Sequence, residues 1–190
     1  MQEIDIRSMT IDELKIELKN MGEAAFRASQ IFQWLHKELV DDYDEMTNLS
    51  KGLREKLKTQ YPIAKVVEVK RFVSEIDGTA KFLFELQDGQ LIESVLMKYK
   101  HGNSVCVSSQ VGCRMGCRFC ASAKLGIDRN LTAGEMMAQF IAMQKDCGER
   151  ISRVVLMGIG EPFDNYDEVV RFIRRLNQKD TFGISYRRMT

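Results

Sequence analysis

Residues 154–162 read Val-Val-Leu-Met-Gly-Ile-Gly-Glu-Pro, a short apolar run that leads directly into a glycine turn. A continuous apolar run of this length, bounded by turn residues, is typical of a strand buried on both faces of a parallel sheet. The residues that follow repeat with helical spacing, which predicts a helix with an inward face of Val169, Phe172, Ile173 and Leu176. The stretch therefore predicts one strand–loop–helix unit of an α/β fold.

A second unit of the same kind precedes it. We expect a strand at residues 104–109. Thr132-Ala-Gly-Glu135 is a capping box, which predicts the start of a helix that runs to about residue 145. A closed barrel of eight such units usually needs about 250 residues. We therefore expect residues 104–190 to be the first βα units of a partial (β/α) barrel.

Upstream, the periodicity predicts an antiparallel meander over residues 63–103, with strands at 64–74, 79–87 and 90–99. Asp77-Gly78 and Asp88-Gly89 are hairpin signals between them. In the third strand, Glu93 shares a face with apolar residues, so desolvation would raise its pKa and make it a candidate proton acceptor. The alternative is a buried structural pair with an arginine.

We expect residues 1–62 to form an all-helical accessory unit. Thr10 caps a first helix that ends at Gly22, a second helix runs from about 25 to 40, and a third begins near 48 or 50 and stops before Pro62. Helical spacing predicts that these helices pack together but leaves their binding partner open.

The composition is that of a globular protein, with 44% hydrophobic and 29% charged residues and a net charge of +1. No apolar run approaches the length of a membrane span and no secretory signal is present, so we expect a cytoplasmic protein without a membrane partner. The basic segments 51–71 and 171–190 fit either a solvated surface or an RNA contact.

Three cysteines, Cys113, Cys117 and Cys120, lie within eight residues. Thiolates crowded in this way suit an iron–sulfur cluster or zinc. Because a closed site takes four ligands, three cysteines leave one metal position open, and an open position is typical of catalysis. The loop therefore indicates an enzyme.

Other interpretations of the loop are chance spacing and structural zinc. The fourth zinc ligand would come from Cys106, Cys147, His36 or His101. A disulfide framework is disfavoured because the number of cysteines is odd and the chain is long enough to bury a core.

The turn at residues 158–162 follows the second expected strand of the barrel, as the cysteine loop follows the first. Both are expected at one edge of the sheet, where ligands gather in parallel α/β folds. Glycines there admit a ligand close to the backbone, and Glu161 could accept hydrogen bonds from an ammonium group. Such a site beside an open iron suits the amino acid end of S-adenosylmethionine, a source of radical chemistry.

The C-x3-C-x2-C run, with Phe119 before its last cysteine, resembles the signature of radical S-adenosylmethionine enzymes. Its context, from Cys106-Val-Ser-Ser-Gln-Val-Gly-Cys113 to Asn130-Leu-Thr and Met157-Gly-Ile-Gly-Glu-Pro162, is similar to the radical RNA adenine-C2 methyltransferases. So are stretches of the helical unit, Phe26-Arg-Ala-Ser-Gln-Ile and Glu45-Met-Thr-Asn-Leu-Ser.

The resemblance implies a role for each matching residue. Cys113, Cys117 and Cys120 would ligate a [4Fe-4S] cluster whose fourth iron S-adenosylmethionine chelates. Gly160 and Glu161 would hold the methionine amino group, with Phe119 near the adenine. Glu93 would be the proton acceptor, and Cys106 would resolve a protein–RNA adduct through a disulfide with a methyl-carrying cysteine.

The resemblance also implies substrates and partners. The family acts on an adenosine of large-subunit ribosomal RNA and on one in the tRNA anticodon loop, and we expect a monomer served by a flavodoxin-like or ferredoxin-like electron donor. The sequence ends at Thr190, before the family's methyl-carrying cysteine, so this chain alone is expected to be inactive. Alternatives are the C8-methylating antibiotic-resistance branch, a radical enzyme acting on a small molecule and a non-catalytic zinc module that binds RNA.

Overall fold

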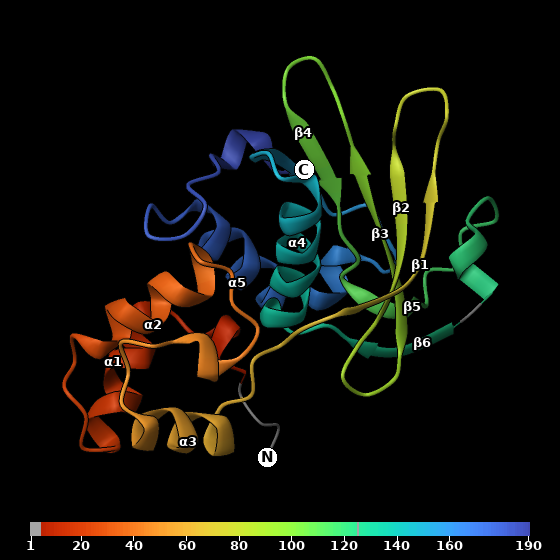
Figure 1. Cartoon of the computed structure of the whole chain (residues 1–190). Coiled ribbons are helices and arrows are strands. Elements are labelled where there is room, and N and C mark those ends of the chain that lie inside the picture. The colour runs from red at the N-terminus through yellow and green to blue at the C-terminus, as the bar shows by residue number, and fades with distance from the viewer. Residues whose placement is uncertain (1–4, 125) are drawn as a thin grey trace.

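The computed structural model describes residues 5–124 and 126–190, apart from the side chain at position 123. A helical unit lies beside a five-stranded sheet that α4 and α5 cover on one side (Figure 1). The fold is α/β, with N-terminal helices, an antiparallel meander and the first strands of a barrel, as the sequence predicts. The division at 62 and 103 stays a prediction, and the meander shares one sheet with the strands that follow it.

The helical unit contains α1 (Ile11–Asn20), α2 (Arg27–His36) and α3 (Lys51–Gln60). Thr10 begins α1 with the expected capping box. The helix expected up to residue 40 ends instead at His36, because Leu39 has a φ of 57°, a left-handed conformation that a helix cannot continue through. These helices bury a core of their own that includes Leu14, Leu35 and Leu53.

The sheet has the strand order β1-β2-β3-β4-β7. Its strands are β1 (Val67–Val73), β2 (Ala80–Glu85), β3 (Leu91–Met97), β4 (Asn103–Cys106) and β7 (Ile151–Val155). The first four pair antiparallel and β4 pairs parallel with β7. Asp77-Gly78 and Asp88-Gly89 lie in the two turns, as predicted, with φ of 70° and 82° at the glycines.

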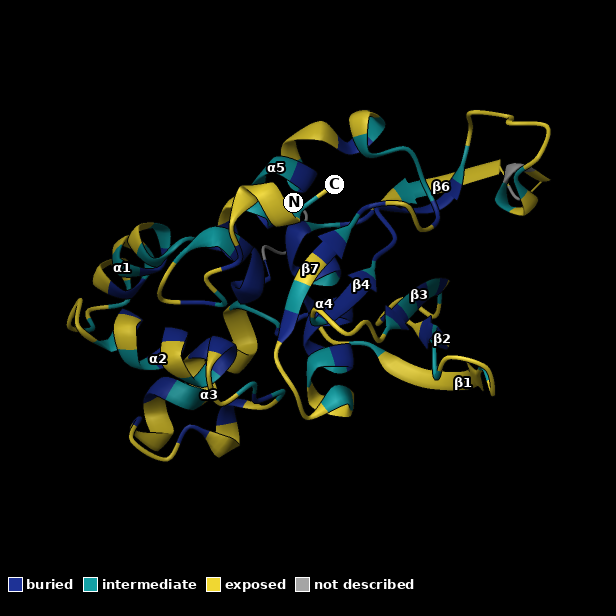
Figure 2. Cartoon of the chain, turned by 90° about the horizontal axis from the view of Figure 1, so that it is seen from above, coloured by how far each residue is buried: buried dark blue, intermediate teal, exposed yellow. Residues whose placement is uncertain are grey.

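One face of this sheet packs on α4 (Ala133–Cys147) and α5 (Tyr166–Asn177), and this core includes Phe82, Leu96 and Phe172. No helix of the described residues covers the opposite face, and β1 is exposed along its whole length (Figure 2). The strand expected to be buried on both faces is therefore half-buried: Val154 points into the core, whereas Val155 is only partly covered and Met157 is 74% exposed. A continuous apolar run does not by itself say whether both faces are covered.

A two-stranded hairpin of β5 (Gln110–Cys113) and β6 (Gly126–Asn130) carries the cysteine loop, and the sequence did not indicate it. Gly112, at φ 75°, lies so close to β6 that an added Cβ would be 1.9 Å from the carbonyl oxygen of Gly126. Only glycine fits at this crossing of two backbones.

The helical unit is attached to the barrel strands through a short 3-10 turn, η1 (Ile6–Ser8). Gly134 at the start of α4 donates a backbone hydrogen bond of 2.8 Å to Ser8 Oγ, and a Cβ there would overlap the Asp5 carboxylate. Farther along, Arg171 donates to Glu13 at 3.0 Å. The two parts of the chain are thus in direct polar contact.

Candidate active site at the carboxyl edge of the sheet

Two loops meet beyond the carboxyl ends of β4 and β7. The backbone N–H groups of Ser109 and Gln110 both donate to the carbonyl of Ile159, at 2.9 and 3.2 Å. The Ile159 N–H in turn donates to Ser108 Oγ at 2.9 Å, and the Glu161 N–H donates to Gln110 Oε1 at 2.8 Å. The structure therefore places the two loops at one sheet edge, as the strand order in the sequence predicts.

The glycines of the second loop permit this contact. An added Cβ at Gly160, whose φ is 109°, would lie 2.7 Å from the Cβ of Gln110, and one at Gly158 would lie 2.7 Å from Ser108 Oγ. Both distances are shorter than side chains tolerate, so the close approach of two loops requires glycine here. A role of Gly160 in ligand binding stays a prediction.

Glu161 begins the short helix η4 (Pro162–Asn165), where one of its carboxylate oxygens accepts a hydrogen bond of 3.0 Å from the Phe163 N–H. The side chain is partly exposed at the loop surface. Because only one carboxylate oxygen of Glu161 accepts this bond at the start of the helix, the second oxygen can accept a hydrogen bond from another donor. Binding of an ammonium group there is a prediction that the geometry permits.

The cysteine loop begins at Cys113, the last residue of β5, and returns through Cys117 and Cys120. Cys117 is exposed, the other two are partly buried, and all five cysteines of the chain are free thiols. Arg114 donates two hydrogen bonds to the Asp164 carboxylate, at 2.6 and 2.7 Å, which ties this loop to η4. The same contact lowers the pKa of Asp164.

The three thiols fit an iron–sulfur cluster by donor type, because soft thiolates are the ligands that such clusters take. In the described ranges, no group of three or more His, Cys, Asp or Glu side chains is arranged to hold a metal ion. The loop would have to draw its thiols together on binding, as is usual for sites that metal binding itself completes. Cys113, Cys117 and Cys120 therefore stay predicted ligands.

The other zinc ligands considered from the sequence have different partners. His36 lies buried in the helical unit, 2.6 Å from the Arg175 guanidinium, and His101 stacks on Tyr99. Cys147 accepts a hydrogen bond from Asn103 at 3.0 Å. None of the three side chains points to the cysteine loop.

Phe119 extends from the tip of the loop and is 94% exposed. The ring is thus available to a ligand, and contact with an adenine stays a prediction.

Cys106 and Glu93 lie on the uncovered face of the sheet. Cys106 is the register partner of Val95, and Glu93 is two residues from Val95 on the same face, so Glu93 and Cys106 are diagonal neighbours about 7 Å apart. Partial burial raises the pKa of the Cys106 thiol, although a hydrogen bond with the Met157 backbone acts in the opposite direction. The register brings together two residues that the sequence named separately.

The environment of Glu93 differs from the expected one. Its side chain is 43% exposed, and Lys81 donates to its carboxylate at 3.0 Å. The expected desolvation among apolar neighbours was wrong, because the apolar core lies on the other face, under Ile92 and Leu96. The alternative of a buried pair with an arginine was also wrong, because the partner of Glu93 is an exposed lysine.

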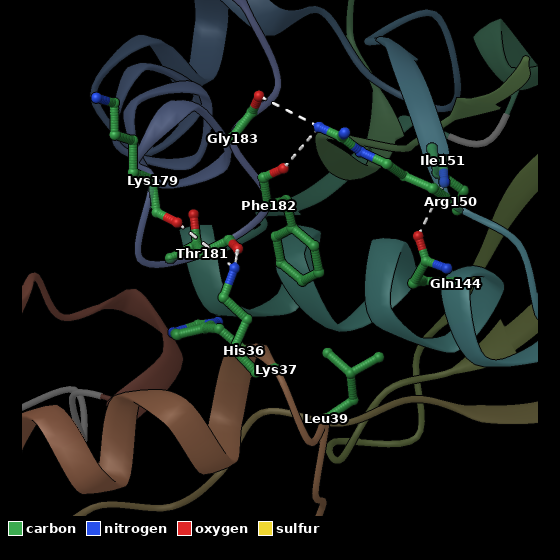
Figure 3. A pocket seen from close by; sticks show the side chains of 10 residues that line it. All are labelled: His36, Lys37, Leu39, Gln144, Arg150, Ile151, Lys179, Thr181, Phe182 and Gly183. Atoms are coloured by element: carbon green, nitrogen blue, oxygen red, sulfur yellow. Dashed lines mark hydrogen bonds between the residues drawn. The ribbon is translucent and has the colours of Figure 1, made fainter.

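A separate pocket of about 550 Å³ lies at the junction of the helical unit and the barrel strands. In Figure 3, Lys37 reaches the carbonyls of Lys179 and Thr181, and Arg150 reaches those of Phe182 and Gly183. These two cations hold the loop that follows α5, so the pocket belongs to the packing of the two parts.

Among the described residues, no helix is long and apolar enough to cross a membrane.

Comparison with known proteins identifies the relatives of the chain. The family model described as the ribosomal RNA large subunit methyltransferase N-terminal domain matches residues 4–63.

Proteins named probable dual-specificity RNA methyltransferase RlmN match almost the entire chain. The one from Lachnoclostridium phytofermentans is 54% identical over 189 residues, which are 100% of this chain and 53% of the relative. The one from Clostridium novyi is 54% identical over 186 residues, 98% of this chain and 54% of the relative. The crystal structure of a radical SAM methyltransferase from Sphaerobacter thermophilus superposes with a TM-score of 0.91 at 42% identity, over 98% of this chain and 55% of that one. The chain is thus similar over almost its whole length to proteins named RlmN, and it spans about half the length of the curated relatives it matches.

Proposed function

We propose that these 190 residues are the cofactor-binding part of a radical S-adenosylmethionine methyltransferase that modifies C2 of an adenosine in large-subunit ribosomal RNA and in the tRNA anticodon loop. The observation that carries the proposal is the hydrogen-bonded contact between the loop at Ile159 and the segment Ser109–Gln110, which leads into the cysteine loop. This contact supports a site that draws on three thiols and a glycine-flanked carboxylate at one sheet edge. Donors of these two kinds are what a [4Fe-4S] cluster and the amino acid end of S-adenosylmethionine require.

In this proposal Cys113, Cys117 and Cys120 bind the cluster, and Glu161, positioned by the fold at Gly160, accepts hydrogen bonds from the methionine ammonium. Phe119 would lie near the adenine. Together the bound groups would supply a carbon-centred radical, which suits an electron-poor ring carbon that resists electrophilic methylation. An external flavodoxin-like or ferredoxin-like protein would deliver the electron.

The two residues on the uncovered sheet face act on the RNA. Glu93 accepts the proton that leaves the adenine, and its exposure lets base and carboxylate meet directly. Cys106 supplies the thiol that releases the product through a disulfide with the methyl-carrying cysteine. The family resemblance places that second cysteine outside the part matched here, so we propose that the 190 residues alone, as a monomer, bind the cofactors without methylating RNA.

Anaerobic reconstitution with iron and sulfide tests the cofactor assignment. About four iron and four sulfide ions per chain are expected, with an electron paramagnetic resonance signal after reduction that changes when S-adenosylmethionine is added. The variant Cys117→Ser should lose this signal, whereas Cys147→Ser, which lies outside the loop, should retain it. A colourless protein that holds only zinc would establish the non-catalytic zinc module instead.

A second measurement addresses the reaction. Regiochemistry and turnover are read by mass spectrometry of RNA treated with a chimera that joins this chain to the remaining half of a curated relative. Methylation at C2 supports the proposal, and methylation at C8 would assign the chain to the antibiotic-resistance branch.

A further inference from the structure

The edge strand β1 presents an aromatic ring on the uncovered face of the sheet. Phe72 is 51% exposed and is the register partner of Lys81 on β2. Its neighbour Arg71 points to the opposite face, where it lies over the buried ring of Phe82 and pairs with Asp146 of α4. The alternation of the strand therefore leaves Phe72 on the same side as Cys106 and Glu93.

Two ammonium groups accompany this ring. Lys70 lies 4.8 Å and Lys81 5.7 Å from the centroid of Phe72. Within residues 5–124 and 126–190, Lys70 forms no salt bridge, while Lys81 also neutralises Glu93 at 3.0 Å. An exposed ring flanked by cations offers a stacking face for a base and positive charge for the adjoining phosphates.

The register connects this ring to the candidate active site. Phe72 pairs with Lys81, Lys81 with Val95, and Val95 with Cys106, so the four residues form one row across four adjacent strands. Three strand spacings correspond to about 14 Å between the Phe72 and Cys106 positions. A base on Phe72 would thus belong to a nucleotide near the target adenosine and not to the target itself.

We propose that Phe72, with Lys70 and Lys81, is a stacking platform for a nucleobase that flanks the target adenosine in single-stranded RNA. The inference rests on the proposed function, from which it takes RNA as the substrate class. The chemistry of the platform favours RNA over a second copy of the chain, because Lys70 and the nearby Lys65 form no salt bridge among the described residues and would repel the same lysines of a copy. Stacking on an aromatic ring is tolerant of sequence, which suits an enzyme with two different RNA substrates.

Binding of a short single-stranded RNA, labelled for anisotropy and carrying 2-aminopurine next to an adenosine, tests the platform in the 190-residue chain. We expect Phe72→Ala and Phe72→Leu to weaken binding about 5- to 100-fold and to abolish quenching of the 2-aminopurine fluorescence. Phe72→Trp should keep both. Because leucine retains the apolar volume, the Leu variant separates loss of stacking from loss of packing.

Ile76→Ala is the matched control, since Ile76 lies in the turn of the same hairpin, is 97% exposed and is off the sheet face. It should bind RNA like the unaltered chain. Equal affinity and quenching in the Phe72→Leu variant would overturn the platform, as would a dimer in sedimentation that only the Phe72 variants disrupt. Absence of saturable binding by the unaltered chain at low salt would overturn it as well.

The triple variant Cys113→Ser, Cys117→Ser, Cys120→Ser distinguishes this inference from the proposed function. It should bind RNA with unchanged affinity and quenching although it cannot assemble a cluster. If the cluster assignment fails while this variant and Phe72→Leu behave as stated, the platform stands by itself.

Discussion

Arg114 and Asp164 join the two loops of the candidate site through paired hydrogen bonds of 2.6 and 2.7 Å. Arg114 directly follows Cys113, and Asp164 lies in η4, directly after the turn that contains Gly160 and Glu161. The planar guanidinium fixes the carboxylate in two directions, which a lysine could not do. This contact fixes where the cysteine loop leaves β5.

Arg114→Ala should therefore loosen the loop without unfolding the protein, because an exposed ion pair adds little to stability. We expect an unchanged thermal midpoint and a faster loss of the reconstituted cluster to an iron chelator. Lys15→Ala, which removes another surface pair, with Asp12, is the control and should lose the cluster at the original rate. Equal rates in the two variants would show that the pair does not restrain the loop.

Gly160→Ala should destabilise the chain by about 1–3 kcal/mol, because the new methyl group meets Gln110 at 2.7 Å and the φ of 109° is strained for alanine. Gly148→Ala provides the comparison, since Gly148 has a φ of 65° but nothing within 4 Å of its added Cβ. Urea unfolding of both variants separates backbone strain from steric overlap. A smaller loss in Gly160→Ala than in Gly148→Ala would contradict the tight contact of the loops.

The stability of the chain should fall as the pH decreases below about 6.5 because of His36. Burial, followed by the charges of Arg175, Arg7 and Lys37, holds the pKa of His36 well below its usual 6.5. The unfolded chain therefore binds a proton at that pH that the folded chain does not, and protonation favours unfolding.

Chemical denaturation from pH 8 to pH 5 measures this effect. His36→Gln removes the titrating group, so the variant should show a shallower decline at the acid end than the unaltered chain. Parallel curves for the two proteins would mean that His36 is not the group responsible. The other histidine, His101, is exposed, and His101→Gln serves as the comparison that shows the effect of losing a histidine outside the core.

Cys106 should react slowly with alkylating reagents in the cluster-free chain. Its partial burial raises the pKa of the thiol and restricts access, whereas Cys117 is exposed. Mass spectrometry of peptides after brief treatment with iodoacetamide near pH 8 should show Cys117 modified well before Cys106. Modification of both at one rate would contradict the placement of Cys106.

The helices and the meander strands could be predicted from the sequence, because an element with one apolar face repeats its apolar residues at the spacing of a helix or of a strand. Thr10, Asp77-Gly78, Asp88-Gly89 and Thr132 mark boundaries that the structure confirms within a few residues. The chain order of strands and loops likewise predicts that the segment at Ile159 lies beside Ser109 and Gln110, which lead into the cysteine loop.

The remaining features depend on contacts distant in sequence. The pattern of β3 shows two faces but not which one the helices cover, so Glu93 was assigned to the wrong surroundings. The β5–β6 hairpin is short and contains Gly112 at its closest approach, which gives it no strand-like period. Gln110 and Asp164 were missed because their partners lie 51 and 50 residues away.

The register of the meander restricts how its length can change. A deletion of one residue within β3 would exchange the two faces of the strand, moving Glu93 under α4 and bringing Ser94, which now donates to Gln139 at 2.8 Å, to the opposite side. Insertions and deletions among homologues should accordingly fall in the turns at 74–79 and 86–90, outside the paired segments.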